Sequence, residues 1–372
     1  MRITLLTSSR ADFGIQLPLL RALADDRTMD VRILAFGAHG DPRFGHTVDQ
    51  IEAADLAPHV LLPPVLDGDA PSDIARAMGR TMEQFSEVWK AGDTDLIIAL
   101  GDRYEMFSAV AASMPFGIPV AHIHGGETTT GAMDDAFRHG ITHMARLHFT
   151  AAGPYRERVI GLLGHDRGVY DTGALSIDNL KTLDLLSIAA IKESFGVDMA
   201  RPTVLVTVHP ETMAPERTTA HANIMCGALQ AIPQDHGILI TMPNADTHGS
   251  VLREAFARFA KEDGRTVAVE SLGTLGYLSC MKHCAYLLGN TSSGYIEASF
   301  FPKHVIDLGE RQTGRIVTPN IQRVPFDLGS IKEAISRIGR TQPAGKGSPY
   351  GDGHAAERMV HAIRSFLNGT QA

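Results

Sequence analysis

The chain has 372 residues, 44% of them hydrophobic and 20% charged, a composition typical of a globular protein with enough apolar material for two cores. A formal net charge of −8 and a pI near 6.1 exclude the clustered basic surface that nucleic-acid binding needs, so we expect a small-molecule partner. No apolar run reaches the ~18 residues of a membrane span and the first residues show no cleavage pattern, which predicts a cytoplasmic protein outside the membrane.

In the first half of the chain, short apolar runs alternate with amphipathic segments. The runs predict strands and the amphipathic segments predict helices. The expected strands are 2–7, 31–37, 95–101, 118–125 and 148–151, and the expected helices are 15–26, 75–92, 104–117 and 134–147.

After a mixed stretch at 171–201, the alternation starts again. The expected strands are 203–209, 237–243, 266–270, 285–290 and 304–309, and the expected helices lie near 217–231, 248–263, 275–284, 293–301 and 354–367. Continuous apolar strands between helices indicate parallel sheets covered on both faces. The sequence therefore predicts an α/β protein with two successive doubly wound units, each with its own core.

Polar stretches follow six of the expected strands, three in each half. In open parallel sheets, ligands bind beyond the carboxyl ends of the strands. We therefore expect these stretches to converge on a cleft between the halves. They read TSSRADFG, GDRYE, HIHGGE, HPET, PNADT and GNTSSGYIEA.

The stretches of the second half are suited to a phosphorylated nucleotide. Ser292 and Ser293 offer hydroxyls and peptide N–H groups at an expected helix start, where an anion is favoured, although plain N-capping is the competing interpretation. No P-loop and no dinucleotide fingerprint occurs. Glu297 is placed to accept hydrogen bonds from a ribose, and His209 is either a phosphate partner or general acid, or a structural histidine.

The stretches of the first half are suited to proton transfer. Asp102 and Glu127 follow neighbouring strands, and Asp134 and Asp135 open the next helix. Neighbouring charge and burial push the pKa values of such carboxylates apart and so create an acid and a base. The competing interpretations are helix capping for the aspartate pair, and for Asp102 a salt bridge to Arg103 or to an arginine elsewhere.

A metal site is the rival interpretation of the same stretch. His122 and His124 fall on one face of a strand, and Asp135, His139 and His143 recur at four-residue intervals along a helix. The five ligands would have to meet from two elements, and two histidines so spaced on a strand are common without metal. We therefore expect no metal and no other cofactor.

Eight blocks occur together in an order and spacing that resemble the hydrolysing UDP-N-acetylglucosamine 2-epimerase family over about residues 1–320. These blocks are SSRADFG, GDRYEMFSA, HIHGGE, DDAFRHGITHMARLHF, VTVHPET, PNADT, GNTSSGYIEA and DLGERQTGR. The resemblance implies a GT-B fold with two Rossmann-like domains, 1–175 and 176–345, and a terminal segment, 346–372, that crosses back to the first. A homodimer fits this family.

The resemblance also implies a reaction. The C2 proton of a UDP-linked 2-acetamido sugar is removed and UDP is expelled, and water adds to the resulting glycal to release N-acetylmannosamine for sialic-acid-type synthesis. The base must be held against a poorly acidic C–H while the diphosphate is stabilised. The residues that match the family's motifs are Asp102, Glu127 and Asp134 as acid/base carboxylates, His209 facing the diphosphate, Arg10, Ser292 and Ser293 as phosphate donors, Glu297 as the ribose ligand, Tyr277 beside the nucleotide base, and His124 and Asn244 as substrate contacts.

The substrate and the class of protein have alternatives. Relatives that epimerise without hydrolysis carry a glutamate near the position of His124 and lack HGGE, so the chain resembles the hydrolysing branch. Within that branch, UDP-2,4-diacetamido-2,4,6-trideoxy-glucose and GDP-N-acetylglucosamine are alternative substrates. A GT-B glycosyltransferase and a non-catalytic nucleotide-sugar sensor are the rival classes; the carboxylates argue against the sensor and the full set of blocks argues against transfer.

Overall fold

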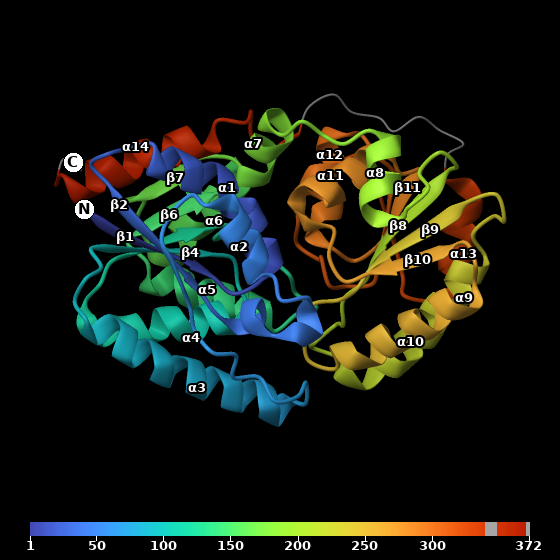
Figure 1. The fold of residues 1–372 in the computed structure, drawn as a ribbon, viewed down its shortest axis with the longest axis horizontal. Helices are drawn as coiled ribbons and strands as arrows, with labels where there is room; N and C mark the ends of the chain where they lie inside the picture. Colours follow the sequence, from blue (N-terminus) through green and yellow to red (C-terminus); the bar gives the residue numbers. More distant parts are fainter. Residues whose placement is uncertain (339–347, 370–372) are drawn as a thin grey trace. The chain divides into compact units, whose positions relative to one another are not determined.

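The structure, a computed structural model, describes residues 1–338 and 348–369 (Figure 1). The chain divides into two compact units. The first contains Met1–Glu127, Asp134–Thr182 and Pro349–Ala372, and the second contains Thr128–Met133 and Leu183–Ser348. The boundary expected between 345 and 346 lies outside the described residues.

The first unit holds a seven-stranded sheet in the order β3-β2-β1-β4-β5-β6-β7, with every neighbouring pair parallel. The chain enters at the middle of the sheet and reverses direction between β1 and β4, so this pair is the switch point where doubly wound sheets bind ligands. The strands are β1 (Arg2–Thr7), β2 (Asp30–Ala35), β3 (His59–Leu61), β4 (Leu96–Leu100), β5 (Val120–Ile123), β6 (Leu147–Thr150) and β7 (Val169–Asp171).

Helices cover both faces of this sheet. The strand β4 shows why both faces must be covered. Successive side chains of a strand point to opposite faces of the sheet, so Leu96 and Ile98 enter one core. Ile97 and Ala99 enter the other. The helices α1, α7 and α14 contribute to the first core, and α3, α4 and α5 to the second. The helices of this unit are α1 (Arg10–Ala24), α2 (Val48–Ala54), α3 (Pro71–Lys90), α4 (Tyr104–Ser113), α5 (Asp134–Met144), α6 (Gly153–Leu163), α7 (Leu175–Thr182) and α14 (Ala355–Leu367), with 3₁₀ turns η1 (Gly37–Gly40), η2 (Pro42–Phe44) and η3 (Met114–Phe116).

The last helix, α14, is fixed to the first unit by hydrogen bonds at its start. The Asp178 carboxylate accepts from the peptide N–H groups of Ala355 and Ala356, at 3.1 and 2.8 Å. An acidic side chain at a helix N-terminus satisfies unpaired donors and complements the helix dipole. Met359 and Ile363 are fully buried in the core beside α1, and Figure 1 shows α14 lying along α1.

The second unit holds a six-stranded parallel sheet in the order β10-β9-β8-β11-β12-β13, with its switch point between β8 and β11. Helices α9, α10 and α13 pack on one face, and α8, α11 and α12 on the other. The elements are β8 (Thr203–Thr207), β9 (Gly237–Thr241), β10 (Thr266–Val269), β11 (Tyr286–Gly289), β12 (Val305–Leu308), β13 (Ile321–Val324), α8 (Ile188–Phe195), α9 (Thr218–Gln230), α10 (Gly249–Glu262), α11 (Gly273–His283), α12 (Glu297–Phe300), α13 (Leu328–Arg337), η4 (Pro215–Arg217) and η5 (Ser292–Gly294).

The short segment Thr128–Met133 packs with the second unit although its flanking residues belong to the first. Thr130 Oγ1 donates to the Thr313 carbonyl at 2.8 Å, and the Met133 peptide N–H donates to Thr212 Oγ1 at 2.9 Å. Gly131 allows this approach, since a Cβ there would lie 2.8 Å from Arg311 Cα.

Two local expectations are wrong. The helix expected at 293–301 is a 3₁₀ turn, η5, followed by the four-residue helix α12, so Ser292 and Ser293 do not open a regular helix. The strand expected at 118–125 ends at Ile123, because His124 adopts a left-handed φ of 65° that no strand accommodates.

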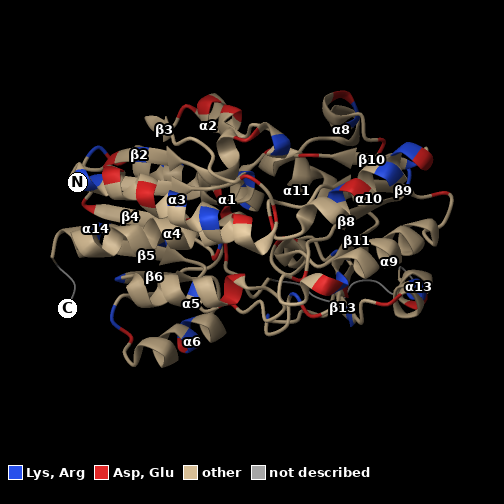
Figure 2. Ribbon diagram, turned by 90° about the horizontal axis from the view of Figure 1, so that it is seen from below, with Lys and Arg blue, Asp and Glu red and all other residues tan. Residues whose placement is uncertain are grey.

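Residues of both charges occur along the described part of the chain. Figure 2 shows Lys and Arg scattered among Asp and Glu along the helices of both units. No helix within residues 1–338 and 348–369 is long and apolar enough to cross a membrane.

Candidate active site

Adjacent strands of the first sheet bring two polar stretches together. In β4 and β5, Leu100 pairs with Ile123, and the Gly101 N–H donates to the Ile123 carbonyl at 3.0 Å. Asp102 and His124 therefore follow neighbouring strand ends, next to the switch point of the sheet. This is the placement that the apolar runs predict.

Arg138, which the sequence analysis missed, joins these groups. It lies on α5, and its side chain is 3% exposed. Its guanidinium donates to the Asp102 carboxylate and, at 2.8 Å, to the His124 carbonyl, and lies 3.8 Å from Glu127 Oε2. A buried guanidinium with fixed donors holds two carboxylates in place and offsets their charge.

The alternative interpretation of Asp102 as a salt-bridge partner is thus correct, with Arg138 as the arginine. Arg103 instead lies against Glu105, whose carboxylate it contacts at 3.1 Å. The Asp102 side chain is still 21% exposed, whereas that of Arg138 is buried. The pairing therefore leaves Asp102 accessible to a ligand.

Glu127 and His124 form a buried pair, with 2.7 Å between Glu127 Oε1 and His124 Nδ1. The loop between them needs its glycines. Gly126 has a φ of 79°, and a Cβ there would lie 2.3 Å from the Tyr155 carbonyl oxygen. The HGGE motif is thus explained by a tight turn that returns the glutamate to the histidine.

His122 is bonded within the protein at both ring nitrogens. Its Nε2 lies 2.8 Å from the Gly101 carbonyl and its Nδ1 lies 3.1 Å from Thr142 Oγ1. Burial lowers its pKa to about 3, so the ring is neutral. A histidine with both nitrogens engaged is not available as a metal ligand, and within the described ranges no group of three or more His, Cys, Asp or Glu is placed to hold a metal ion.

The other candidate residues of the first unit lie at the starts of two helices. Asp134 is the first residue of α5 and is half-buried, while Asp135 Oδ2 lies 3.5 Å from His139 Nε2. Arg10 opens α1 and is half-buried. The turn that leads to it is fixed by the buried Asp12, which accepts from the Ser8 N–H at 2.6 Å and the Ser8 hydroxyl at 2.9 Å.

In the second unit, the strand ends at the switch point of the sheet are linked through one amide. Asn290, after β11, accepts from the His209 N–H at 2.8 Å and donates to the His209 carbonyl at 2.9 Å. His209 Nδ1 lies 3.2 Å from Asp246 Oδ2. The peptide and the ring of His209 are therefore both held, and the sequence analysis named neither Asn290 nor Asp246 as a site residue.

Hydroxyl groups line the turn that follows Asn290. Ser293 Oγ lies 2.6 Å from the Tyr277 hydroxyl and 3.1 Å from Thr291 Oγ1, with Ser292 beside it in η5. Burial raises the pKa of Tyr277 to about 12, so its hydroxyl stays protonated. Hydroxyls and peptide N–H groups in a tight turn are suited to diphosphate oxygens.

The remaining candidate site residues of the second unit differ in burial. Glu297 is buried at the start of α12, 7% exposed, and Asn244 is half-buried after β9. Gln312 donates to the Asn290 carbonyl at 2.8 Å, and Arg311 donates to the same oxygen at 3.2 Å. The motif that carries them, DLGERQTGR, was noted in the sequence, but neither residue was named as a site residue.

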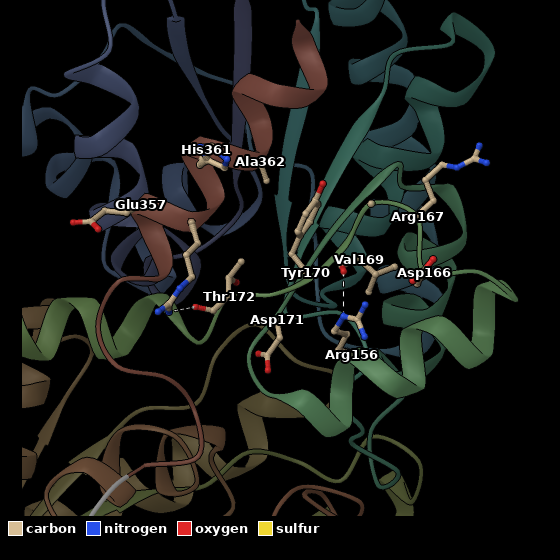
Figure 3. Close-up of a pocket in the computed structure, with 12 residues that line it drawn as sticks. Arg156, Asp166, Arg167, Val169, Tyr170, Asp171, Thr172, Glu357, His361 and Ala362 are labelled. Carbon is tan, nitrogen blue, oxygen red and sulfur yellow. Dashed lines mark hydrogen bonds between the residues drawn. The ribbon is translucent and has the colours of Figure 1, made fainter. Parts of the chain in front are cut away.

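A pocket of about 750 Å³ lies elsewhere in the first unit, between β7 and α14 (Figure 3). Arg156 Nε donates to the Val169 carbonyl at 3.3 Å, and Arg358 Nη1 donates to the Thr172 carbonyl at 3.1 Å. These arginines bind carbonyls beside the edge strand of the sheet. The pocket contains none of the candidate residues, so we place the chemistry at the strand ends.

The two parallel sheets, each wrapped by helices and each with polar groups at its switch point, define a protein with two Rossmann-like domains of the GT-B kind. Residues 21–364 match the family described as UDP-N-acetylglucosamine 2-epimerase, and the chain belongs to this family. The fold class and the family predicted from the eight blocks are confirmed.

Individual relatives refine this placement. The chain is 28% identical to a GDP/UDP-N,N'-diacetylbacillosamine 2-epimerase (hydrolyzing) of Campylobacter jejuni, over 91% of this chain and 87% of that protein. It is 27% identical to a UDP-N,N'-diacetylbacillosamine 2-epimerase (hydrolyzing) of Legionella pneumophila, over 98% and 96% of the two chains. Its fold is similar to that of a UDP-GlcNAc 2-epimerase of Neisseria meningitidis solved with UDP-GlcNAc, with a TM-score of 0.81, 15% identity and coverage of 98% and 100%.

Proposed function

We propose that this chain is a hydrolysing nucleotide-sugar 2-epimerase whose substrate is UDP-N,N'-diacetylbacillosamine, which is UDP-2,4-diacetamido-2,4,6-trideoxy-glucose. The names of the Campylobacter and Legionella relatives support this substrate. UDP-N-acetylglucosamine, the first expectation from the sequence, is less well supported than this alternative. The products are UDP and the free 2,4-diacetamido sugar with inverted configuration at C2.

The observation that carries the proposal is the array in which the buried Arg138 holds the carboxylates of Asp102 and Glu127, with His124 against Glu127. A sensor that only binds a nucleotide sugar has no use for carboxylates held in this way. Removal of a C2 proton does need such an array, because the C–H bond is a poor acid and the base must be fixed against it. Asp102, and Asp134 at the start of α5, are the carboxylates that we assign to proton transfer, and Glu127 completes the array.

We assign the UDP moiety to groups of the second unit. Ser292, Ser293 and the peptide groups of η5 are suited to the diphosphate. His209, oriented by Asp246, is suited to face the departing phosphate and to donate a proton to it. Glu297 is suited to the ribose hydroxyls, and Tyr277 and Asn244 to contacts with the nucleotide.

NMR of the purified protein in D₂O, with each nucleotide sugar in turn and no acceptor, tests the proposal. With UDP-N,N'-diacetylbacillosamine we expect UDP and a manno-configured sugar with one deuterium at C2, because the abstracted proton exchanges with solvent. Turnover of UDP-N-acetylglucosamine alone, with the same label, would make the substrate wrong and leave the reaction intact. A gluco-configured product without deuterium would contradict the elimination mechanism and favour hydrolysis or glycosyl transfer.

A further inference from the structure

The carboxylate of Glu127 faces protein groups on both sides. Its Oε1 lies 2.7 Å from His124 Nδ1, and its Oε2 lies 3.8 Å from Arg138 Nη1. The side chain is 2% exposed. Both carboxylate oxygens of Glu127 thus face protein groups, and almost none of the side chain is open to a substrate.

The ring of His124, unlike the Glu127 carboxylate, has one polar atom without a protein partner. Its Nδ1 is engaged by Glu127, while its Nε2 is buried and has no hydrogen-bond partner among the described residues. A buried polar atom without a partner has lost its hydrogen bonds to water and destabilises the protein. His124 follows the end of β5, the strand beside β4 and Asp102, and ligands bind beyond such strand ends, so a ligand is the partner that this atom would gain.

The backbone of His124 is held in an unusual conformation. Its φ of 65° is in the left-handed region, which bulky residues rarely adopt. Arg138 donates to its carbonyl at 2.8 Å, and its own N–H donates to the Phe149 carbonyl at 2.9 Å. These bonds and the Gly125–Gly126 turn fix the direction of the ring.

The partner of Nδ1 determines the protonation pattern of the ring. An ionised carboxylate only accepts hydrogen bonds, so Nδ1 carries the hydrogen that it shares with Glu127. In the neutral ring, Nε2 then carries a lone pair. The buried, unpartnered atom is therefore a proton acceptor.

We propose that His124 is the catalytic residue that removes the C2 proton, and that Glu127 is a positioning residue that acts through it. The inference rests on the proposed function. Nε2 takes the C2 proton, the C2–H electron pair forms the C1=C2 bond, and the C1–O bond breaks with its electron pair leaving on UDP. The imidazolium that forms is stabilised by Glu127 and later returns its proton to solvent.

Two glutamine variants test the assignment, because the alternative makes Glu127 itself the base. His124→Gln removes the acceptor, and we expect kcat to fall ~10³-fold with UDP affinity unchanged. Glu127→Gln keeps an oxygen for Nδ1–H and loses only the countercharge, so we expect a fall of ~10-fold. A larger loss of kcat in Glu127→Gln than in His124→Gln would overturn the proposal.

Chemical rescue by imidazole distinguishes a catalytic role of His124 from a structural one, because a purely structural role would give no rescue. His124→Gly suits the left-handed backbone and vacates the space of the ring, so added imidazole is expected to restore turnover at least ~10-fold, measured with deuterium entry at C2 in D₂O. The matched control is His122→Gly, which removes a histidine bonded at both ring nitrogens, and we expect no rescue there. Equal rescue of both variants would overturn the selective role of His124.

The wild-type protein separates this inference from the proposed function. If it releases no UDP and incorporates no deuterium with either nucleotide sugar, the proposed function fails. If it is active and His124→Gln retains full kcat, the proposed function stands and the role of His124 is overturned. Urea denaturation checks that the first unit of each variant is folded.

Discussion

The two units have the same architecture but different groups at the ends of their strands. In the first unit, Asp102 and Glu127 are held by the buried guanidinium of Arg138. In the second, an amide, hydroxyls and peptide groups dominate, with Asn290 clamping the peptide of His209. One sheet thus presents fixed charge and the other presents mostly neutral donors and acceptors.

We interpret this difference as a separation of two tasks in the proposed reaction. Proton transfer requires ionised groups whose positions do not relax, and buried ion pairs supply this because breaking them is costly. Binding of a nucleotide diphosphate requires many donors of moderate strength, each replaceable at a small loss. Substitutions in the first unit should therefore affect turnover and stability, and those in the second should affect affinity.

The largest effect is expected for Arg138→Met. The buried Glu127 and the partly exposed Asp102 would lose their cation, so we expect the first unit to lose about 3–5 kcal/mol of stability and turnover to fall by ~10³-fold or more. Urea denaturation and UDP release measure the two effects. The control is Arg167→Met, an exposed arginine of the same unit, for which stability should change by less than about 0.5 kcal/mol. Unchanged stability in Arg138→Met would show that the ion-pair array is not what distinguishes this unit.

The second-largest effect is expected for Asp102→Asn. The amide keeps the shape of the side chain and part of its bonding to Arg138 but no longer transfers a proton, so we expect kcat to fall ~10²-fold or more. UDP affinity, measured by calorimetry, should stay within twofold. Loss of UDP affinity in parallel with kcat would make Asp102 a binding residue. It would contradict the assignment of turnover to the first unit and of nucleotide affinity to the second.

A smaller effect is expected in the second unit. Glu297→Ala removes the carboxylate assigned to the ribose, and we expect UDP binding to weaken by roughly 1–3 kcal/mol while kcat at saturation changes little. Glu254→Ala, on the exposed surface of α10, is the matched control. An unchanged UDP affinity in Glu297→Ala would remove this residue from the nucleotide site.

No effect is expected from chelation. His122, one of the histidines in the rival metal interpretation, is bonded at both ring nitrogens, so UDP release should proceed at an unchanged rate in EDTA. The measurement is the rate before and after dialysis against chelator, followed by addition of Zn²⁺ or Mg²⁺. Activity lost in EDTA and restored by one ion would replace the carboxylate chemistry of the first unit with metal chemistry.

The sequence predicts the strand ends better than the contacts beyond them. The apolar run at 95–101 places Asp102 at the end of β4 because a buried strand needs apolar side chains on both faces. Arg138 was missed because an arginine on an amphipathic helix is usually solvated, and only the tertiary packing of α5 buries it. The left-handed His124 was missed because a non-glycine residue carries no sequence signal for that backbone.

The second unit shows a different limit. The run GNTSSGYIEA was interpreted as a helix start, but the structure forms a 3₁₀ turn in which the Thr291 hydroxyl accepts from the Ser293 N–H. Thr and Ser side chains compete for backbone donors in this way, so their presence predicts a turn or a cap without deciding between them. The clamp by Asn290 joins residues 81 positions apart and has no local signature.

The return of the chain to its first unit has a consequence for folding. The helix α14 covers α1 and donates its first peptide N–H groups to Asp178, although the stretch Leu183–Ser348 of the second unit separates it from both in the chain. The core of the first unit therefore closes only when two parts of the chain that lie far apart in the sequence meet, whereas the strands of the second unit come from one continuous stretch. Deletion of Ala355–Leu367 would expose the core of the unit that carries Asp102, more than 200 positions upstream, and remove no strand of the second sheet.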